Sequence, residues 1–176
     1  MDFKHYLHII WWHLASAEKR IQYLRNKGMQ IGSGCSISKD VQFGTEPYLI
    51  KIGNDVRLTS SVKFVTHDGG MWVLRNKYNM PDADKFGTIE IGNNVNIGWN
   101  TIIMPNVMIG DNCVIGAGAI VTRSIPSNSV AAGIPARVIE TIDEYYEKNI
   151  SKMDFIKELS PEKKKAYLMD KYEVYK

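Results

Sequence analysis

A repeat of six residues runs from Ile91 to Ile125, and it limits the folds open to this chain more than any other feature. Cut into sixes, the stretch reads IGNNVN, IGWNTI, IMPNVM, IGDNCV, IGAGAI and VTRSI. The first place of each six is aliphatic, and glycine often follows it. A period of six fits neither a helix, which has 3.6 residues per turn, nor a single strand, which has two. The repeat therefore reflects how the chain winds in three dimensions.

Repeats of six residues are typical of a parallel β-helix. Each six supplies a short strand and a turn, the coils stack about 4.8 Å apart, and the first-place side chains line one core. Glycine and asparagine suit the tight corners, because glycine tolerates positive φ and asparagine can hydrogen-bond its own backbone. First places at twelve positions predict about four coils of three sixes: 31, 37, 43, 52, 58, 64, 91, 97, 103, 109, 115 and 121.

The period is interrupted twice. Three extra residues precede Ile52, and the pattern stops for the sixteen residues 71–86. Long loops that leave a compact solenoid are more often functional than accidental, although this one could also contact a neighbouring subunit. We therefore predict three parts: an N-terminal amphipathic helix within 1–29, a β-helix domain at 30–139 with an excursion loop at 71–86, and a helical tail at 140–176.

Apolar residues from Leu7 to Leu24 recur in steps of three and four, which predicts one amphipathic helix ending near Gly28. This helix is expected to pack on the end of the solenoid or on another subunit. The alternative is a helix at a membrane interface, because Trp11 and Trp12 also favour that boundary.

The tail carries two helix-start signals, Ser151 before the segment FIKEL and Ser160 before Pro161. We expect the apolar side of these helices to cap the open edge of the solenoid, which would otherwise invite strand addition. The winding itself is predicted to end after Ile125, where Pro126 follows.

Composition narrows the function classes. A net charge of +3, with no basic run longer than Lys163–Lys165, gives no footprint for nucleic acid. Cys35 and Cys113 both occupy fifth places and are expected to be buried thiols, which agrees with a reducing cytoplasm. The apolar run near the N-terminus is too short to span a bilayer and does not resemble a signal peptide.

Three of the four histidines lie on the first predicted helix, and His67 alone lies in the repeat region. His5 and His8 would be two imidazoles without a third ligand, so no metal site is expected. His67 precedes the excursion in the segment FVTHDGG, and this junction favours a general base over a core residue. Motifs for a nucleophile elbow, a phosphate loop or a dinucleotide fold are missing.

The excursion mixes aromatic and hydrogen-bonding side chains in a way that suits a polar ligand such as a sugar. The candidate contacts to such a ligand are Trp72, Arg75, Tyr78 and Asn79 in the excursion, with Ser61 and Asp68 beside it. Consecutive side chains on an extended segment point to opposite faces. Asp68 is therefore expected to contact the ligand or to shape the corner. A role for Asp68 in orienting His67 stays open.

Three features together resemble the hexapeptide-repeat acyltransferases over about residues 30 to 140: the hexads, the histidine before an excursion, and the closing run IGAGAIVTRSIPSNSVAAGIPARVI. The closing run is similar to those of galactoside, maltose and xenobiotic acetyltransferases. The segment RIQYLRNKGMQIG and the helical tail look more like acetyltransferases of bacterial capsule and surface-polysaccharide biosynthesis.

The resemblance implies a left-handed β-helix, a homotrimer, and acetyl-CoA bound in the groove between subunits, with no metal. His67 matches the catalytic histidine of the family. Glu140 departs from the pattern, because some relatives carry a basic residue there. Positions that match the cofactor-binding residues of the family are Gly98, Trp99, Gly116, Ala117, Thr122, Arg123 and Arg137.

The expected reaction is direct acetyl transfer from acetyl-CoA to a hydroxyl of a sugar or polysaccharide precursor, with His67 as general base. Transfer to the amine of a nucleotide-linked amino sugar is the alternative, since a hydroxyl and an amine need the same base. Two readings from other classes are a non-catalytic scaffold and a zinc enzyme resembling carbonic anhydrase. The zinc enzyme would need three histidines from the coils.

Overall fold

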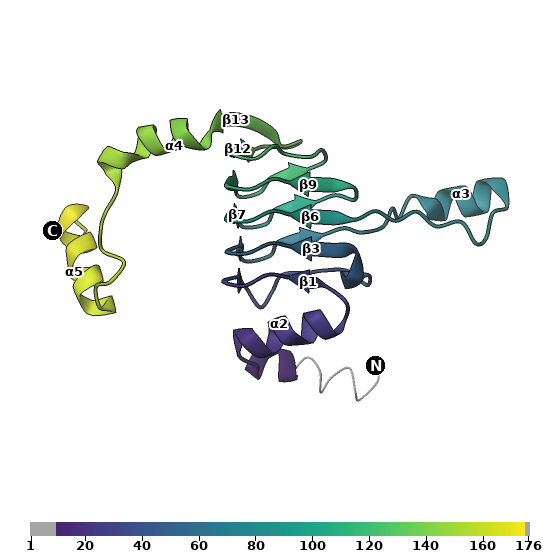
Figure 1. Ribbon diagram of the computed structural model, residues 1–176, viewed down its shortest axis with the longest axis horizontal. Coiled ribbons are helices and arrows are strands. Elements are labelled where there is room, and N and C mark those ends of the chain that lie inside the picture. The colour runs from purple at the N-terminus through teal and green to yellow at the C-terminus, as the bar shows by residue number, and fades with distance from the viewer. Residues whose placement is uncertain (1–9, 175–176) are drawn as a thin grey trace. The chain divides into compact units, whose positions relative to one another are not determined.

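The structure is a computed structural model that describes residues 10–174, and its centre is a stack of coils built from three mainly parallel sheets (Figure 1). Sheet A contains β1 (Gln30–Ile31), β3 (Ile50–Ile52), β6 (Ile89–Ile91) and β9 (Val107–Ile109). Sheet B contains β2 (Ser36–Ile37), β4 (Arg57–Leu58), β7 (Val95–Ile97), β10 (Cys113–Ile115), β12 (Ser129–Ala132) and β13 (Arg137–Thr141). Sheet C contains β5 (Lys63–Phe64), β8 (Ile102–Ile103) and β11 (Ile120–Val121).

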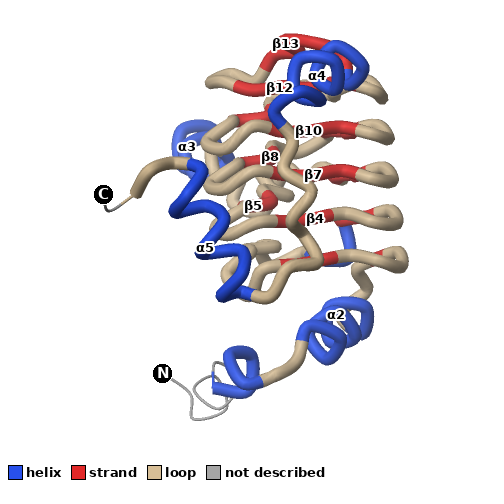
Figure 2. The backbone as a smooth tube through the Cα atoms, turned by 90° about the vertical axis from the view of Figure 1, so that its left-hand side faces the viewer, coloured by secondary structure: helices blue, strands red, loops and turns tan. Residues whose placement is uncertain are grey.

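The chain visits the three sheets in turn, so that strands three apart in sequence lie side by side. In the second to fourth coils β3 pairs with β6 and β6 with β9, all parallel, and the same order holds in the other two sheets. Figure 2 shows the stacked strands of sheet B from the side. The prediction of a mainly β fold built from stacked hexad coils is confirmed.

The interior of the stack is filled by the residues that the period singles out. All twelve first-place side chains are buried, and Ile97, Ile103, Ile109 and Ile115 have no exposed surface. Fifth-place residues such as Val95 and Ala119 are also buried. The first-place and fifth-place side chains of each six therefore point into one apolar core. Burial of their apolar surface is the main contribution to the stability of the coils.

Asparagine occupies the corners for two reasons. Asn94, Asn112 and Asn128 have φ between 53° and 59°, a region that asparagine tolerates better than most residues. Their side chains also form a ladder, in which Asn94 donates to Asn112 at 2.9 Å and Asn112 donates to Asn128 at 3.0 Å. Each corner is thus tied to the corner of the next coil.

The first helix differs from its prediction. The described part of the chain has helical residues 10–14, a break, and then α2 (Ala17–Asn26), so a continuous helix from Leu7 to Leu24 is wrong. The break follows from Ser16, which is extended and accepts a hydrogen bond from the N–H of Lys19 as an N-cap. Histidines 5 and 8 lie outside the described residues.

Helix α2 covers the first coil. Leu24 is buried against it, and the Arg25 guanidinium donates to the carbonyls of Ile31 and Gly32 at 2.9 Å. Gly28 has φ of +91°, as expected for the residue that lets the chain turn out of the helix. The prediction that the first helical region packs on the end of the solenoid is confirmed for α2. Among residues 10–174 no helix is both long and apolar enough to cross a membrane.

The excursion is a helical arm and not a simple loop. Its two legs meet at an antiparallel bridge between His67 and Phe86, and the arm (residues 68–85) carries α3 (Met71–Tyr78) at its end (Figure 1). Methionine, leucine, arginine and lysine in this segment favour a helix. Asn79 ends it with φ of 51°. The predicted excursion loop at 71–86 therefore contains a helix, which the interruption of the repeat did not indicate.

The C-terminal part was also predicted incompletely. The winding continues beyond Ile125, because β12 pairs parallel with β10, and β13 then folds back antiparallel on β12. A helix over FIKEL is wrong, since the helices are α4 (Ile142–Asn149) and α5 (Pro161–Lys171), with Ser160 as the N-cap of α5. Residues 144–176 form a compact unit of their own, and capping of the solenoid by these helices stays a prediction.

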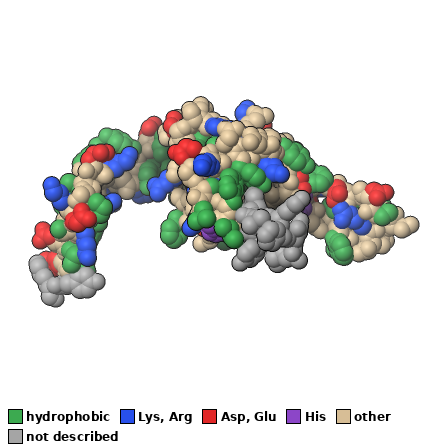
Figure 3. Space-filling view, turned by 90° about the horizontal axis from the view of Figure 1, so that it is seen from below, with side chains coloured by type: hydrophobic (Ala, Val, Ile, Leu, Met, Phe, Trp, Pro, Cys, Tyr) green, Lys and Arg blue, Asp and Glu red, His purple; other side chains and the backbone are tan. Residues whose placement is uncertain are grey.

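The two cysteines differ in burial, so the expectation of two buried thiols is confirmed for Cys113 and wrong for Cys35. Cys35 and Cys113 are free thiols, and burial raises the pKa of Cys113. Cys113 is fully buried, whereas Cys35 is partly exposed. Seen from below the view of Figure 1, side chains of both charges are scattered over the surface (Figure 3).

Candidate active site

His67 lies at the corner where the strands of sheet C end and the chain turns into sheet A. It follows β5, while Asn106 and Thr122 follow β8 and β11 at the same corner of the next two coils. A cavity of about 400 Å³ opens here. Six of its lining residues carry polar or aromatic groups: His67, Asp68, Lys85, Phe86, Asn106 and Thr122.

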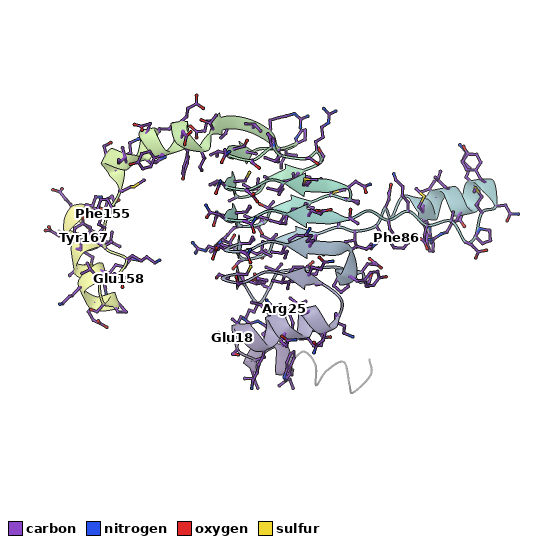
Figure 4. All side chains as sticks on the ribbon, viewed as in Figure 1. Glu18, Arg25, Phe86, Phe155, Glu158 and Tyr167 are labelled. Carbon is purple, nitrogen blue, oxygen red and sulfur yellow. The ribbon has the colours of Figure 1, made fainter. Side chains whose placement is uncertain are left out.

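The imidazole is positioned from two sides and remains accessible. Its side chain is 50 % exposed, and its Nδ1 lies 3.3 Å from Oε2 of Glu46. The ring of Phe86, at the base of the arm in Figure 4, meets the imidazole edge-on with centroids 6.3 Å apart. A fixed and accessible imidazole at a cavity is the arrangement that a general base requires.

Glu46 was missed by sequence reasoning. It lies between Phe43 and Ile52, in the segment where the repeat is interrupted by three extra residues, and its side chain is 14 % exposed. The Thr45 hydroxyl donates to Oε1 at 2.5 Å and the buried Thr66 hydroxyl donates to Oε2 at 2.8 Å. These hydroxyls, with His67 as a weaker contributor, hold the pKa of Glu46 below its ordinary value. A usable signal existed, because Glu46 and His67 each stand three places after a first-place phenylalanine.

Asp68 lies beside His67 in sequence but its carboxylate is bound elsewhere. It accepts from the N–H of Gly70 at 2.9 Å and from the Lys85 ammonium at 3.2 Å. These two donors hold the pKa of Asp68 below its ordinary value. The carboxylate closest to the imidazole nitrogen comes from Glu46, so Asp68 shapes the corner and lines the cavity, as the alternation of side chains predicts.

The remaining acceptor candidates do not line this cavity within one chain. The Arg75 guanidinium donates to the carbonyl of Ala83 at 2.7 Å and pairs with Asp84, which ties α3 to the returning leg of the arm. Trp72 and Tyr78 are exposed on the arm. Ser61 donates to Asp40 at another corner, between sheets B and C. Their roles stay predictions.

The candidate cofactor residues fall into two groups. Thr122 lines the cavity of His67, while Trp99 and Ala117 are exposed at the corner between sheets B and C. Gly98 and Gly116 lie beside them for a structural reason. A Cβ on Gly98 would lie 2.5 Å from the backbone nitrogen of Ala117, and one on Gly116 would lie 2.9 Å from Cβ of Ala132.

The basic candidates are exposed near the end of the stack. Arg123 directly follows Thr122, and Arg137 begins β13, with one guanidinium nitrogen donating to the carbonyl of Ala136 at 2.8 Å. Exposed guanidinium groups of this kind suit phosphate oxygens. Their contact with a nucleotide stays a prediction.

Elsewhere the structure has a larger cavity. This cavity of about 750 Å³ lies between α2 and the segment 43–48, and its lining is mostly aromatic and aliphatic, with Tyr23, Phe43 and Tyr48 among the lining side chains. In the part of the chain that the structure describes, no cluster of His, Cys, Asp or Glu could hold a metal ion.

Known proteins share the repeat of this chain, and one of them matches it over most of its length. Residues 88–123 match the family described as "Bacterial transferase hexapeptide (six repeats)". The galactoside O-acetyltransferase of Escherichia coli is 41 % identical over 103 residues, which cover 56 % of this chain and 47 % of that protein. Protein CapG of Staphylococcus aureus is 48 % identical over 152 residues, which cover 85 % of this chain and 87 % of CapG. The chain belongs to the hexapeptide-repeat acetyltransferases.

A solved structure of another hexapeptide-repeat acetyltransferase agrees with this assignment. A galactoside acetyltransferase in complex with coenzyme A superposes with a TM-score of 0.58 and is 31 % identical, over 78 % of this chain and 78 % of that one. The family resemblance in the sequence is thus confirmed, and the chain is an acyltransferase.

Proposed function

We propose that this chain is an acetyl-CoA-dependent O-acetyltransferase that acts on a hydroxyl of a sugar or polysaccharide precursor. The observation that carries the proposal is the half-exposed His67 at the mouth of a cavity, with one ring nitrogen held by a carboxylate. Support comes from the relatives, since one is named a galactoside O-acetyltransferase and a similar structure holds coenzyme A.

In the proposed mechanism the Nε2 atom of His67 removes the proton of the acceptor hydroxyl as its oxygen attacks the acetyl carbon of the thioester. Backbone N–H groups hold the oxyanion that develops on the acetyl oxygen. The intermediate then collapses with cleavage of the C–S bond. The imidazolium returns its proton to the leaving thiolate, so the ester and free coenzyme A are formed and His67 is regenerated.

We further propose that the coils form a left-handed β-helix and that three chains assemble around the site. Acetyl-CoA would then lie between subunits, near Trp99, Ala117 and Thr122, with Arg123 and Arg137 toward its phosphates. Support comes from the exposure of these side chains and from the small surface at Ala117 and Gly118, where a pantetheine arm has room. A cytoplasmic location, expected from the cysteines, stays a prediction.

The test is thiol release from acetyl-CoA with a panel of neutral sugars and amino sugars, with the product identified by mass. We expect an O-acetyl sugar and a loss of at least about 100-fold in rate for His67→Ala. His13→Ala is the control and should keep the wild-type rate. An N-acetyl product would favour the amine alternative, and substantial activity in His67→Ala would contradict the general-base role. Light scattering should give three times the 20.0 kDa mass of one chain.

A further inference from the structure

Both interruptions of the repeat occur at the same corner in consecutive coils. The first coil leaves sheet C after Gln42, which bridges Lys63, and reaches sheet A at Ile50. The second leaves sheet C after Phe64 and reaches sheet A at Ile89 by way of the arm. The rings of Phe43 and Phe64 stack with centroids 5.2 Å apart, so the two corners lie directly over each other.

This stacking places Glu46 and His67 in one column, three places after their phenylalanines. The contact joins residues 21 apart in sequence. The corner of the first coil therefore does more than join two strands, because it presents a carboxylate to the histidine of the neighbouring coil. Sequence adjacency would have favoured Asp68, whose carboxylate is held by Gly70 and Lys85.

The hydrogen bonds of Glu46 decide what the imidazole can present to the cavity. Each carboxylate oxygen already accepts a hydrogen bond from a hydroxyl, Oε1 from Thr45 and Oε2 from Thr66. An ionised carboxylate is only an acceptor, so a neutral imidazole beside it has to donate from Nδ1. Nε2 then carries the lone pair and faces away from Glu46. The 3.3 Å separation is at the long end for such a bond and has room to shorten when the site closes on substrate.

We infer that Glu46 is the positioning residue for His67, holding the imidazole as the Nδ1–H tautomer so that Nε2 is the base. This inference rests on the proposed function, because it assigns a base role to His67. Thr45 and Thr66 support it by fixing the carboxylate. The other charged groups that line the cavity or lie beside the ring are Asp68 on the outgoing leg of the arm and Lys85 on the returning leg, and these two pair with each other.

The first measurement is independent of catalysis. Nitrogen-15 spectra of the intact enzyme report the tautomer of each neutral histidine, and His67→Ala identifies the signal. We expect His67 to be mostly the Nδ1–H tautomer in the wild type. Glu46→Met keeps the size of the side chain but removes the carboxylate that accepts the hydrogen bond from Nδ1, so the preference should be lost. Glu90→Met, which removes an exposed glutamate of sheet A, is the matched control and should leave the spectrum of His67 unchanged.

The second measurement is kinetic. We expect Glu46→Met to lower kcat by about 10- to 100-fold with little change in KM, as positioning of the base affects the reaction more than substrate binding. Glu46→Gln, which keeps an acceptor oxygen but loses the charge, should be intermediate. Glu46→Gln also serves as the test variant if Glu46→Met lowers the melting temperature sharply.

The positioning role of Glu46 and the proposed function are overturned by different outcomes. An unchanged tautomer of His67 in both Glu46 variants would overturn the positioning role, even if kcat fell, because the loss would then be structural. An inactive wild type, or full activity in His67→Ala, would overturn the proposed function. In that case the spectra would still decide whether Glu46 fixes the imidazole.

Discussion

At the residue scale, the periodic pattern indicates which side chains are buried but not which corner residues meet. The twelve first places could be predicted because a buried position repeats every six residues, and His67 stood out as the histidine at an interruption. Glu46 could not be found in the same way, because its role depends on which corner lies above it. Gly98 and Gly116 match cofactor positions of the family, and the structure adds that their backbones touch the next coil.

A prediction follows for Gly98, whose added Cβ would lie 2.5 Å from the backbone of Ala117. Overpacking of this kind costs about 1–3 kcal/mol. We expect Gly98→Ala to lower the free energy of unfolding by about that amount in chemical denaturation. Gly69→Ala is the matched control, since a Cβ there meets nothing within 4 Å. Equal stability of the two variants would show that the coils separate easily at this point.

At the element scale, the coils follow from the repeat, whereas the segments outside it follow from local chemistry. Ser16 breaks the first helical region because its side chain caps α2, and the apolar spacing across the break does not reveal this. Helix α3 forms within a stretch without period, and β13 pairs at the end of the stack where the hexads have stopped. Period alone was therefore a poor guide to these elements.

The arm supplies the prediction at this scale. Arg75 joins α3 to the returning leg through Ala83 and Asp84, so Arg75→Ala should loosen the arm while the coils stay intact. We expect faster hydrogen exchange over residues 71–84 and an unchanged melting temperature. Lys77→Ala, on the same helix, is the control. Equal exchange rates in the two variants would mean that the antiparallel legs alone hold the arm.

At the scale of the whole molecule, several carboxylates stabilise the folded state through hydrogen bonds to their ionised form. The Ser38 hydroxyl, followed by other groups, lowers the pKa of Asp40, and the Thr45 and Thr66 hydroxyls lower that of Glu46. The ordinary values are 3.8 and 4.5. Near these values the unfolded chain binds more protons than the folded chain, so stability falls as the pH is lowered.

We therefore expect the stabilisation from Glu46 to be fully present above pH 4.5, the ordinary pKa of its carboxyl group. Below this pH the melting temperature should fall, and the fall should continue until the pH passes the lowered pKa that Glu46 has in the folded state. Asp40→Asn, which removes one of these groups, should give a shallower dependence on pH. Asp82→Asn removes an exposed carboxylate on the arm and serves as the control. The check is a series of thermal melts at constant ionic strength, and a slope in Asp40→Asn equal to that of the wild type would contradict the assignment.

The corner between sheets C and A has a further consequence. The ladder bonds of the coils continue on both sides of it, with Phe64 donating to the carbonyl of Gln42 before the corner and Ile50 pairing with Ile89 after it. Two segments of very different length, residues 43–49 and 65–88, join these points in consecutive coils, and the strands on either side stay paired. We expect that exchanging residues 44–49 would give His67 a different neighbour in place of Glu46 while the paired strands on either side of the corner stay intact.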